Sequence, residues 1–269
     1  MNDNGVVVHS TCHLIDLFAS NPAYLEALNE CTEPERWHAI ADFVARRIQC
    51  AQDPQIQTLE LSDVSSKKWN KGSRKARRKK SHICPLVLER TDIFCNAKGS
   101  VVHVTLHVAT DGTVDVKQRV DTFLSNLLSG EDVLENMMRH VACVVLQNRL
   151  RAYLESKKWI AFVANGSILP RKSGATAQPM ASPPAVAFQS PKEYQQTIVV
   201  SGMRKLKQHL LHSPQIQSSA ATDDTAVEIT GMVVSAGITL IVGGGYHGKV
   251  SALKTRPFFW CCSHTLSVC

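Results

Sequence analysis

The feature that most restricts the fold is an apolar run that leads directly into a glycine-rich loop. Residues 238–242 read Ile-Thr-Leu-Ile-Val, and residues 243–249 read Gly-Gly-Gly-Tyr-His-Gly-Lys. A continuous apolar run bounded by glycines predicts a strand that is buried on both faces of a sheet. The glycines let successive backbone N–H groups turn inward around an anion without clashes from Cβ atoms. The sequence therefore predicts a buried strand that ends in an anion-binding loop.

The loop matches GxxxxGK, the pattern of phosphate-binding loops, and a glycine-rich hairpin turn is the alternative. The residues expected to hold nucleotide phosphates are Gly243, Gly244, Gly245, Tyr246, His247, Gly248 and Lys249. Lys249 is expected to contact the β and γ phosphates as a point charge. The pattern then departs from its usual form, because such loops place Ser or Thr after the lysine to bind Mg²⁺. Val250 stands there and has no oxygen, while Ser251 comes one residue late.

The segment 238–249 resembles the predicted ATPases of the ABC class, whose phosphate loop reads TLIVGGGYHGKS. Residues 162–174, FVANGSILPRKSG, resemble the FVADGAILPRRSG block of the same family. Residues 186–191 (VAFQSP) and residues 87–91 (VLERT) fit the family order. The resemblance covers about residues 85–249. Chemistry alone assigns no role to Asn165-Gly166 or to Arg171-Lys172. A structural turn is one reading, and a place of Arg171 near the nucleotide is the other.

The resemblance implies an α/β fold, in which an N-terminal α+β region precedes an ABC-type nucleotide-binding domain. It implies ATP as the ligand, Mg²⁺ as the usual cofactor, and dimerisation through the ATPase domain in full-length members. The glutamine loop, signature helix and second acidic strand of such ATPases follow the phosphate loop, yet few residues follow Lys249. We therefore expect an incomplete, truncated domain that binds ATP without hydrolysing it. Val250-Ser251 is also what a read-through splice donor would encode.

The resemblance, the charge pattern and the helical periodicity together predict five segments. They are an N-terminal helical region (1–66), a disordered basic tract (67–80), an α+β domain (81–164), the start of the ATPase domain (165–249) and a non-homologous tail (250–269).

The basic tract accounts for the charge of the chain, which is +7 overall with a pI of about 9.0. Nine of its residues are basic: Lys67, Lys68, Lys71, Arg74, Lys75, Arg77, Arg78, Lys79 and Lys80. A solvated loop is one reading of such a run, and a nucleic-acid or nuclear-import patch is the other. The alternative function is therefore a nucleic-acid-binding module, although Trp69 offers the tract only one ring for stacking.

Cysteine and histidine patterns favour no metal site. The nine cysteines form no CxxC pair, and their odd number argues against a disulfide framework. Cys261, Cys262, Cys269 and His264 form the one cluster that could be read as ligands. His103 and His107 share a strand face but lie roughly 13 Å apart, too far to share a metal. Asp115 is a conceivable cross-strand ligand, and a solvated sheet face is the simpler reading.

The N-terminus is a poor leader, because residues 1–8 carry Asp3 and no basic residue. We expect an intracellular chain, cytoplasmic or nuclear, with no membrane partner.

Periodicity predicts helices over residues 14–18, 24–28, 34–49, 120–128 and 131–157. Alternation predicts strands over residues 159–163, 195–200 and 227–234, and weakly around residues 59–61. A further strand over 101–108 is expected to form a hairpin with 113–117 through Asp111-Gly112. Residues 172–184 are expected to form a loop, and residues 212–224 a mobile linker.

Overall fold

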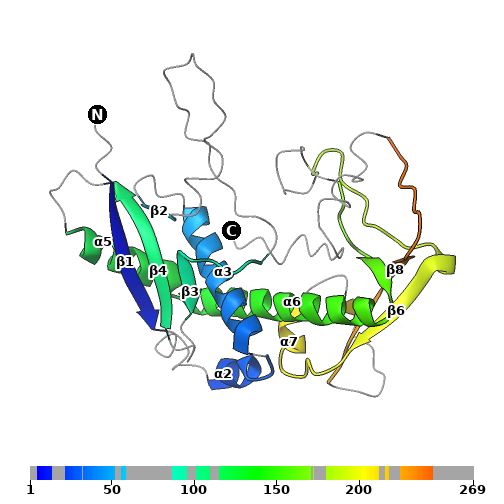
Figure 1. The fold of residues 1–269 in the computed structure, drawn as a ribbon, viewed down its shortest axis with the longest axis horizontal. Coiled ribbons are helices and arrows are strands. Elements are labelled where there is room, and N and C mark those ends of the chain that lie inside the picture. Colours follow the sequence, from blue (N-terminus) through cyan, green and yellow to red (C-terminus); the bar gives the residue numbers. More distant parts are fainter. Residues whose placement is uncertain are drawn as a thin grey trace, which may run out of the picture. The chain divides into compact units, whose positions relative to one another are not determined.

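The computed structural model describes residues 5–13, 22–31, 33–51, 56–58, 87–95, 101–109, 115–170, 172, 180–211, 216–217 and 225–244. The chain divides into two compact units. Figure 1 shows the helices and strands of the chain. Unit 1 comprises mainly Met1–Leu25 and Thr32–Met137, and unit 2 comprises Glu26–Cys31 and Met138–Ser267. Both units combine helices with an antiparallel sheet, which is consistent with a mixed α/β chain. The helix predicted over residues 14–18, the basic tract and the tail lie outside the described residues.

Sheet A of unit 1 is built around strand β4 (Val101–Ala109). β1 (Gly5–His13) pairs along one edge of β4, while β2 (Ile56–Thr58) and β3 (Ile93–Cys95) pair with β4 as well. The strand predicted over residues 101–108 is confirmed, and β1 was not anticipated. The predicted hairpin with residues 113–117 is wrong, because Val116 begins helix α5 (Val116–Leu128).

Local capping explains why the chain turns helical where alternation predicts a strand. The Asp115 carboxylate accepts hydrogen bonds from the backbone N–H groups of Lys117 and Gln118, at 3.0 and 3.3 Å. An aspartate at this position satisfies N–H groups that the first helical turn leaves open. The buried residues of α5 are Val120, Leu124 and Leu128, four residues apart as a helix requires. Gly130, with φ of +107°, follows the helix where the sequence predicts its end.

Helix α3 (Glu33–Ala51) supplies much of the core of unit 1, and the helix predicted over residues 34–49 is confirmed. Ile40, Phe43 and Val44 on this helix are fully buried. α3 contacts β2, β3 and α5, so its apolar side covers the inner face of sheet A. The short helix α2 (Pro22–Leu28) matches the prediction over residues 24–28.

Helix α6 (Glu131–Ser156) confirms the helix predicted over residues 131–157, and the boundary between the units falls within it. Sheet B of unit 2 consists of β5 (Trp159–Ala164), β6 (Gln195–Val200), β7 (Ile216–Gln217) and β8 (Val227–Ser235). A 3₁₀ turn (Lys192–Tyr194) precedes β6. β5, β6 and β8 confirm three predicted strands. The predicted linker is partly wrong, because residues 216–217 form β7 and pair with β8.

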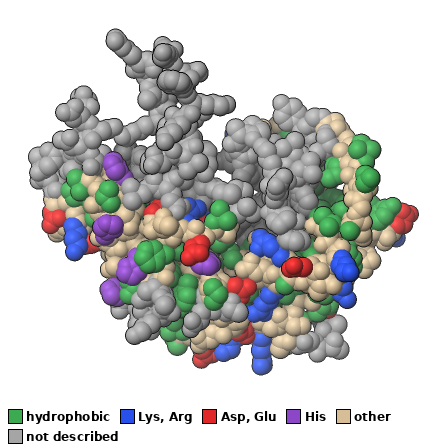
Figure 2. Space-filling view, viewed as in Figure 1, with side chains coloured by type: hydrophobic (Ala, Val, Ile, Leu, Met, Phe, Trp, Pro, Cys, Tyr) green, Lys and Arg blue, Asp and Glu red, His purple; other side chains and the backbone are tan. Residues whose placement is uncertain are grey.

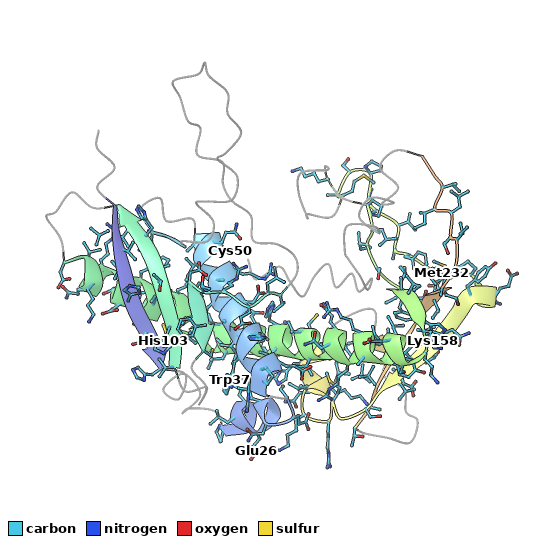
Figure 3. All side chains as sticks on the ribbon, in the orientation of Figure 1. Glu26, Trp37, Cys50, His103, Lys158 and Met232 are labelled. Atoms are coloured by element: carbon cyan, nitrogen blue, oxygen red, sulfur yellow. The ribbon has the colours of Figure 1, made fainter. Side chains whose placement is uncertain are left out.

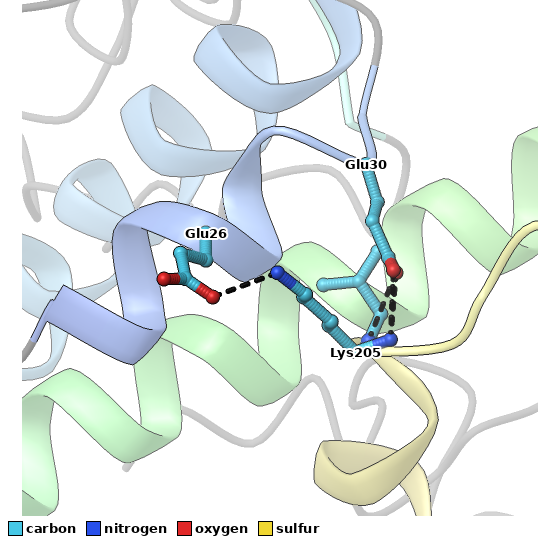
Figure 4. A network of polar contacts seen from close by, with 4 residues as sticks. Glu26, Glu30 and Lys205 are labelled. Atoms are coloured by element: carbon cyan, nitrogen blue, oxygen red, sulfur yellow. Dashed lines mark hydrogen bonds and ion pairs between the residues drawn. The ribbon is translucent and has the colours of Figure 1, made fainter.

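A polar network in unit 2 fixes the segment that enters helix α7 (Lys207–Leu210). The Glu30 carboxylate accepts the backbone N–H of Lys205 at 2.8 and 2.9 Å and that of Leu206 at 3.3 Å (Figure 4). The Lys205 ammonium pairs with Glu26 at 2.7 Å. This hydrogen bond and the lysine charge hold the pKa of Glu26 below its ordinary value. The carboxylate of Glu30 thus satisfies N–H groups at the start of a short helix.

Among the helices that the structure describes, none is long and apolar enough to cross a membrane. Cys12, Cys31, Cys95 and Cys143 form no disulfide, whereas Cys50 is disulfide-bonded, which the sequence did not indicate.

Candidate functional site

Strand β8 leads toward the glycine-rich loop and lies between β5 and β6 in sheet B. Its middle residue, Gly231, pairs with Ala164 of β5 and with Gln196 of β6. A Cβ atom at Gly231 would lie 2.3 Å from the backbone oxygen of Val163 and 2.8 Å from the Cα of Ala164. Glycine is therefore required for β8 to approach β5. A glycine inside an alternating strand is the sequence signal for such an approach.

Two sequence blocks of the expected ATPase meet beside β8. The side-chain oxygen of Asn165 accepts the backbone N–H of Ser190 at 2.7 Å, and the Asn165 N–H donates to the Thr230 oxygen at 2.9 Å. Gly166 donates to the backbone oxygen of Phe188, and Phe188 in turn donates to that of Ser167, both at 2.8 Å. Asn165-Gly166 forms a turn, as predicted, with Gly166 at φ of +82°. The structure gives Asn165 a structural role at this turn, while Arg171 lies outside the described residues.

The buried strand predicted over residues 238–242 is wrong. These residues have no regular secondary structure, and Ile238, Leu240 and Val242 are 105%, 84% and 74% exposed. Gly237, with φ of +139°, turns the chain directly before the run. Sheet B pairs β8 only through Val227–Ser235, and no described strand pairs with 238–242. Apolar composition favours burial, but a strand also needs a neighbour that satisfies its backbone groups.

Comparison with protein families decides what this part of the chain is. Residues 134–212 and 207–255 match the family described as ABC_ATPase: P-loop domain. These residues are similar to the P-loop domain of ABC-class ATPases. The match confirms the resemblance, and it takes in α6, sheet B, the Asn165 turn and the glycine-rich loop. No curated protein matches the chain.

The structure places two of the seven expected loop residues of this P-loop domain. Gly243 and Gly244 are exposed, and Gly243 has φ of +146°, a conformation that residues with a Cβ rarely adopt. This conformation fits the need for glycine in an anion-binding loop. Gly245, Tyr246, His247, Gly248 and Lys249 lie outside the described residues, so their arrangement stays a prediction.

The donor set of the P-loop domain does not fit a magnesium ion held by the protein in the usual way. The residue after Lys249 is Val250, whose side chain offers no oxygen. In the described part of the chain, no three His, Cys, Asp or Glu side chains are grouped so that they could hold a metal ion.

Proposed function

We propose that the chain binds ATP through residues 243–249 of its P-loop domain. The observation that carries this proposal is the family match over residues 207–255, which runs across the whole GxxxxGK segment. The glycine backbone at Gly243, Gly244, Gly245 and Gly248 supplies N–H donors for phosphate oxygens. Tyr246 and His247 lie within the same loop.

Lys249 contributes the positive charge for the β and γ phosphates. Replacing Lys249 by alanine is expected to weaken ATP binding about 10- to 100-fold, because a hydrogen bond to a charged group is worth about 1.5–3 kcal/mol. Isothermal titration calorimetry of the full chain measures the change. Lys254→Ala is the matched control, since it removes a neighbouring lysine outside the motif and is expected to leave binding unchanged. Equal affinities of the native chain and Lys249→Ala would contradict the assignment.

Hydrolysis is a separate question, and we propose that this chain does not turn over ATP. Mg²⁺ normally neutralises charge that develops on the transferred phosphoryl group, and Val250 removes the hydroxyl that helps to hold it. Phosphate release is expected to stay orders of magnitude below the ordinary enzymatic median of roughly 10 s⁻¹. Turnover near that rate, lost in Lys249→Ala, would prove this wrong. In Val250→Ser, Mg²⁺ is expected to strengthen ATP binding more than it does in the native chain.

The remaining expectations from the resemblance are kept as proposals. The division at residues 164 and 249 and dimerisation through the ATPase domain are supported by the family resemblance alone, whereas the division at residues 66 and 80 is supported by the charge of the basic tract. Analytical ultracentrifugation with and without ATP tests the proposed dimerisation.

A further inference from the structure

The outer face of sheet A, turned away from α3 and α5, carries a concentration of histidines. On β4, Val104 and Leu106 are buried, whereas His103, Thr105 and His107 alternate with them on the other face. Ser10 of β1 lies opposite Val104 and bonds to Asp121 of α5, so these positions define the inner face. The outer face holds four histidines, gathered over β1 and β4 in Figure 2: His9, His13, His103 and His107.

An exposed phenylalanine completes this surface. Phe94 of β3 lies opposite His103 in the register, is 43% exposed, and stacks on the His103 ring with centroids 5.0 Å apart and planes 17° apart. Figure 3 marks His103 on the sheet. His9 on the neighbouring strand hydrogen-bonds to Thr105 at 3.1 Å. A cavity of about 720 Å³ is lined by His9, Phe94 and His103 and also by Lys117, Asp121 and Leu124 of α5, so it extends beyond the outer face. Aromatic rings thus extend over three adjacent strands.

The charges around this face favour a polyanion. The four strands of sheet A contain no Asp or Glu, so no acidic side chain of these strands repels phosphate groups. The nine Lys and Arg residues of the basic tract lie in the sequence between β2 and β3, which both pair with β4. The tract begins within nine residues of Thr58, a chain length that spans at most about 30 Å. The chain segment that joins β2 to β3 therefore carries nine positive charges.

We propose that the outer face of sheet A, centred on Phe94, His103 and His9, binds unpaired bases of a single-stranded nucleic acid. Bases stack on Phe and His rings, and ring nitrogens and hydroxyls can hydrogen-bond to base edges. Bases in a duplex are already stacked and cannot lie on such a surface. The basic tract raises the local concentration of the strand, and the site itself is the sheet face. This activity is independent of ATP binding by the P-loop domain.

Fluorescence anisotropy with a labelled single strand of about 12 nucleotides tests the proposal, at about 50 mM salt. Phe94→Leu keeps an apolar side chain but loses the ring, and it is expected to weaken binding about 10-fold. Phe94→Tyr retains the ring and is expected to bind like the native chain. Val199→Ala, which truncates an exposed apolar side chain on β6, is the matched control and is expected to change nothing. RNA and DNA strands of the same sequence are compared to show which of the two nucleic acids the sheet face prefers.

Two further variants separate the contributions of the basic tract, the sheet face and the ATP-binding loop. Changing the nine basic residues to glutamine is expected to reduce the salt dependence of binding, whereas Phe94→Leu is expected to leave it unchanged. Lys249→Ala is expected to bind the oligonucleotide normally, so failure of ATP binding and failure of this proposal are distinguishable. Native affinity in Phe94→Leu, equal binding of a duplex, or no binding by the native chain would each overturn the proposal. Equal melting temperatures of Phe94→Leu and Phe94→Tyr show that the difference arises from the ring.

Discussion

Replacing Gly231 by alanine is expected to destabilise unit 2 by about 3 kcal/mol or more. The added Cβ would lie 2.3 Å from the Val163 backbone oxygen and 2.7 Å from the Phe162 ring. The ring could shift, but the backbone of β5 could not do so without breaking its pairing with β8. Because β8 lies at the centre of sheet B, a displacement here would disturb β5 and β6 together.

Hydrogen exchange, followed peptide by peptide, measures this loss in the full chain, since the two units need not unfold together. Amides of β5 and β8 are expected to exchange faster in Gly231→Ala, while those of sheet A remain unchanged. Gly237→Ala is the matched control, because nothing lies within 4 Å of a Cβ there and only the strain at its φ of +139° is added. A smaller effect of Gly231→Ala than of Gly237→Ala would contradict the close approach of the strands.

Replacing Asp42 by alanine is expected to destabilise unit 1 by about 3–5 kcal/mol. The Asp42 carboxylate on α3 is fully buried and accepts two hydrogen bonds from Arg46, at 2.6 and 3.2 Å. Arg90, also buried, approaches the same carboxylate at 3.9 Å. Removing the carboxylate would leave two buried guanidinium groups without this countercharge, and a buried charge without a partner is costly.

Hydrogen exchange in α3 and sheet A, monitored at increasing urea concentrations, measures how much Asp42→Ala lowers the free energy of unfolding of unit 1. Glu89→Ala is the control, because Glu89 is an exposed carboxylate next to Arg90 and surface substitutions usually cost less than about 0.5 kcal/mol. Asp42→Asn keeps the shape and removes the charge, so an intermediate loss is expected. Equal stability of Asp42→Ala and Glu89→Ala would show that the buried pair contributes nothing.

Helices and their ends could be predicted from the sequence because the information is local. Apolar residues at helical spacing predict α3 and α6. Gly130 comes directly after such a segment and therefore predicts a helix end. Strand pairing is different, because alternation shows that β4 is a strand without naming its partner. β4 pairs with β1, whose residues 5–13 lie far away in the sequence, and this pairing displaced the expected local hairpin.

The candidate site was predictable in type and only partly in structure. The GxxxxGK pattern predicts the loop, and the family match over residues 207–255 runs across it. Residues 238–242 were expected to be buried because they are apolar, but burial depends on neighbouring strands that a sequence pattern does not reveal. The roles of Asn165 and Arg90 also required the structure, since their partners Ser190 and Asp42 are distant in the sequence.

ATP binding at residues 243–249 is tested most directly by hydrogen exchange in the full chain with and without ATP. Backbone N–H groups that donate to phosphate oxygens exchange slowly, so peptides covering residues 243–249 are expected to be protected by ATP. Adenosine, which lacks phosphates, is expected to give no protection, and Lys249→Ala is expected to lose most of it. Protection of other peptides alone, or protection that adenosine reproduces, would contradict the proposal that this loop binds the phosphates of ATP.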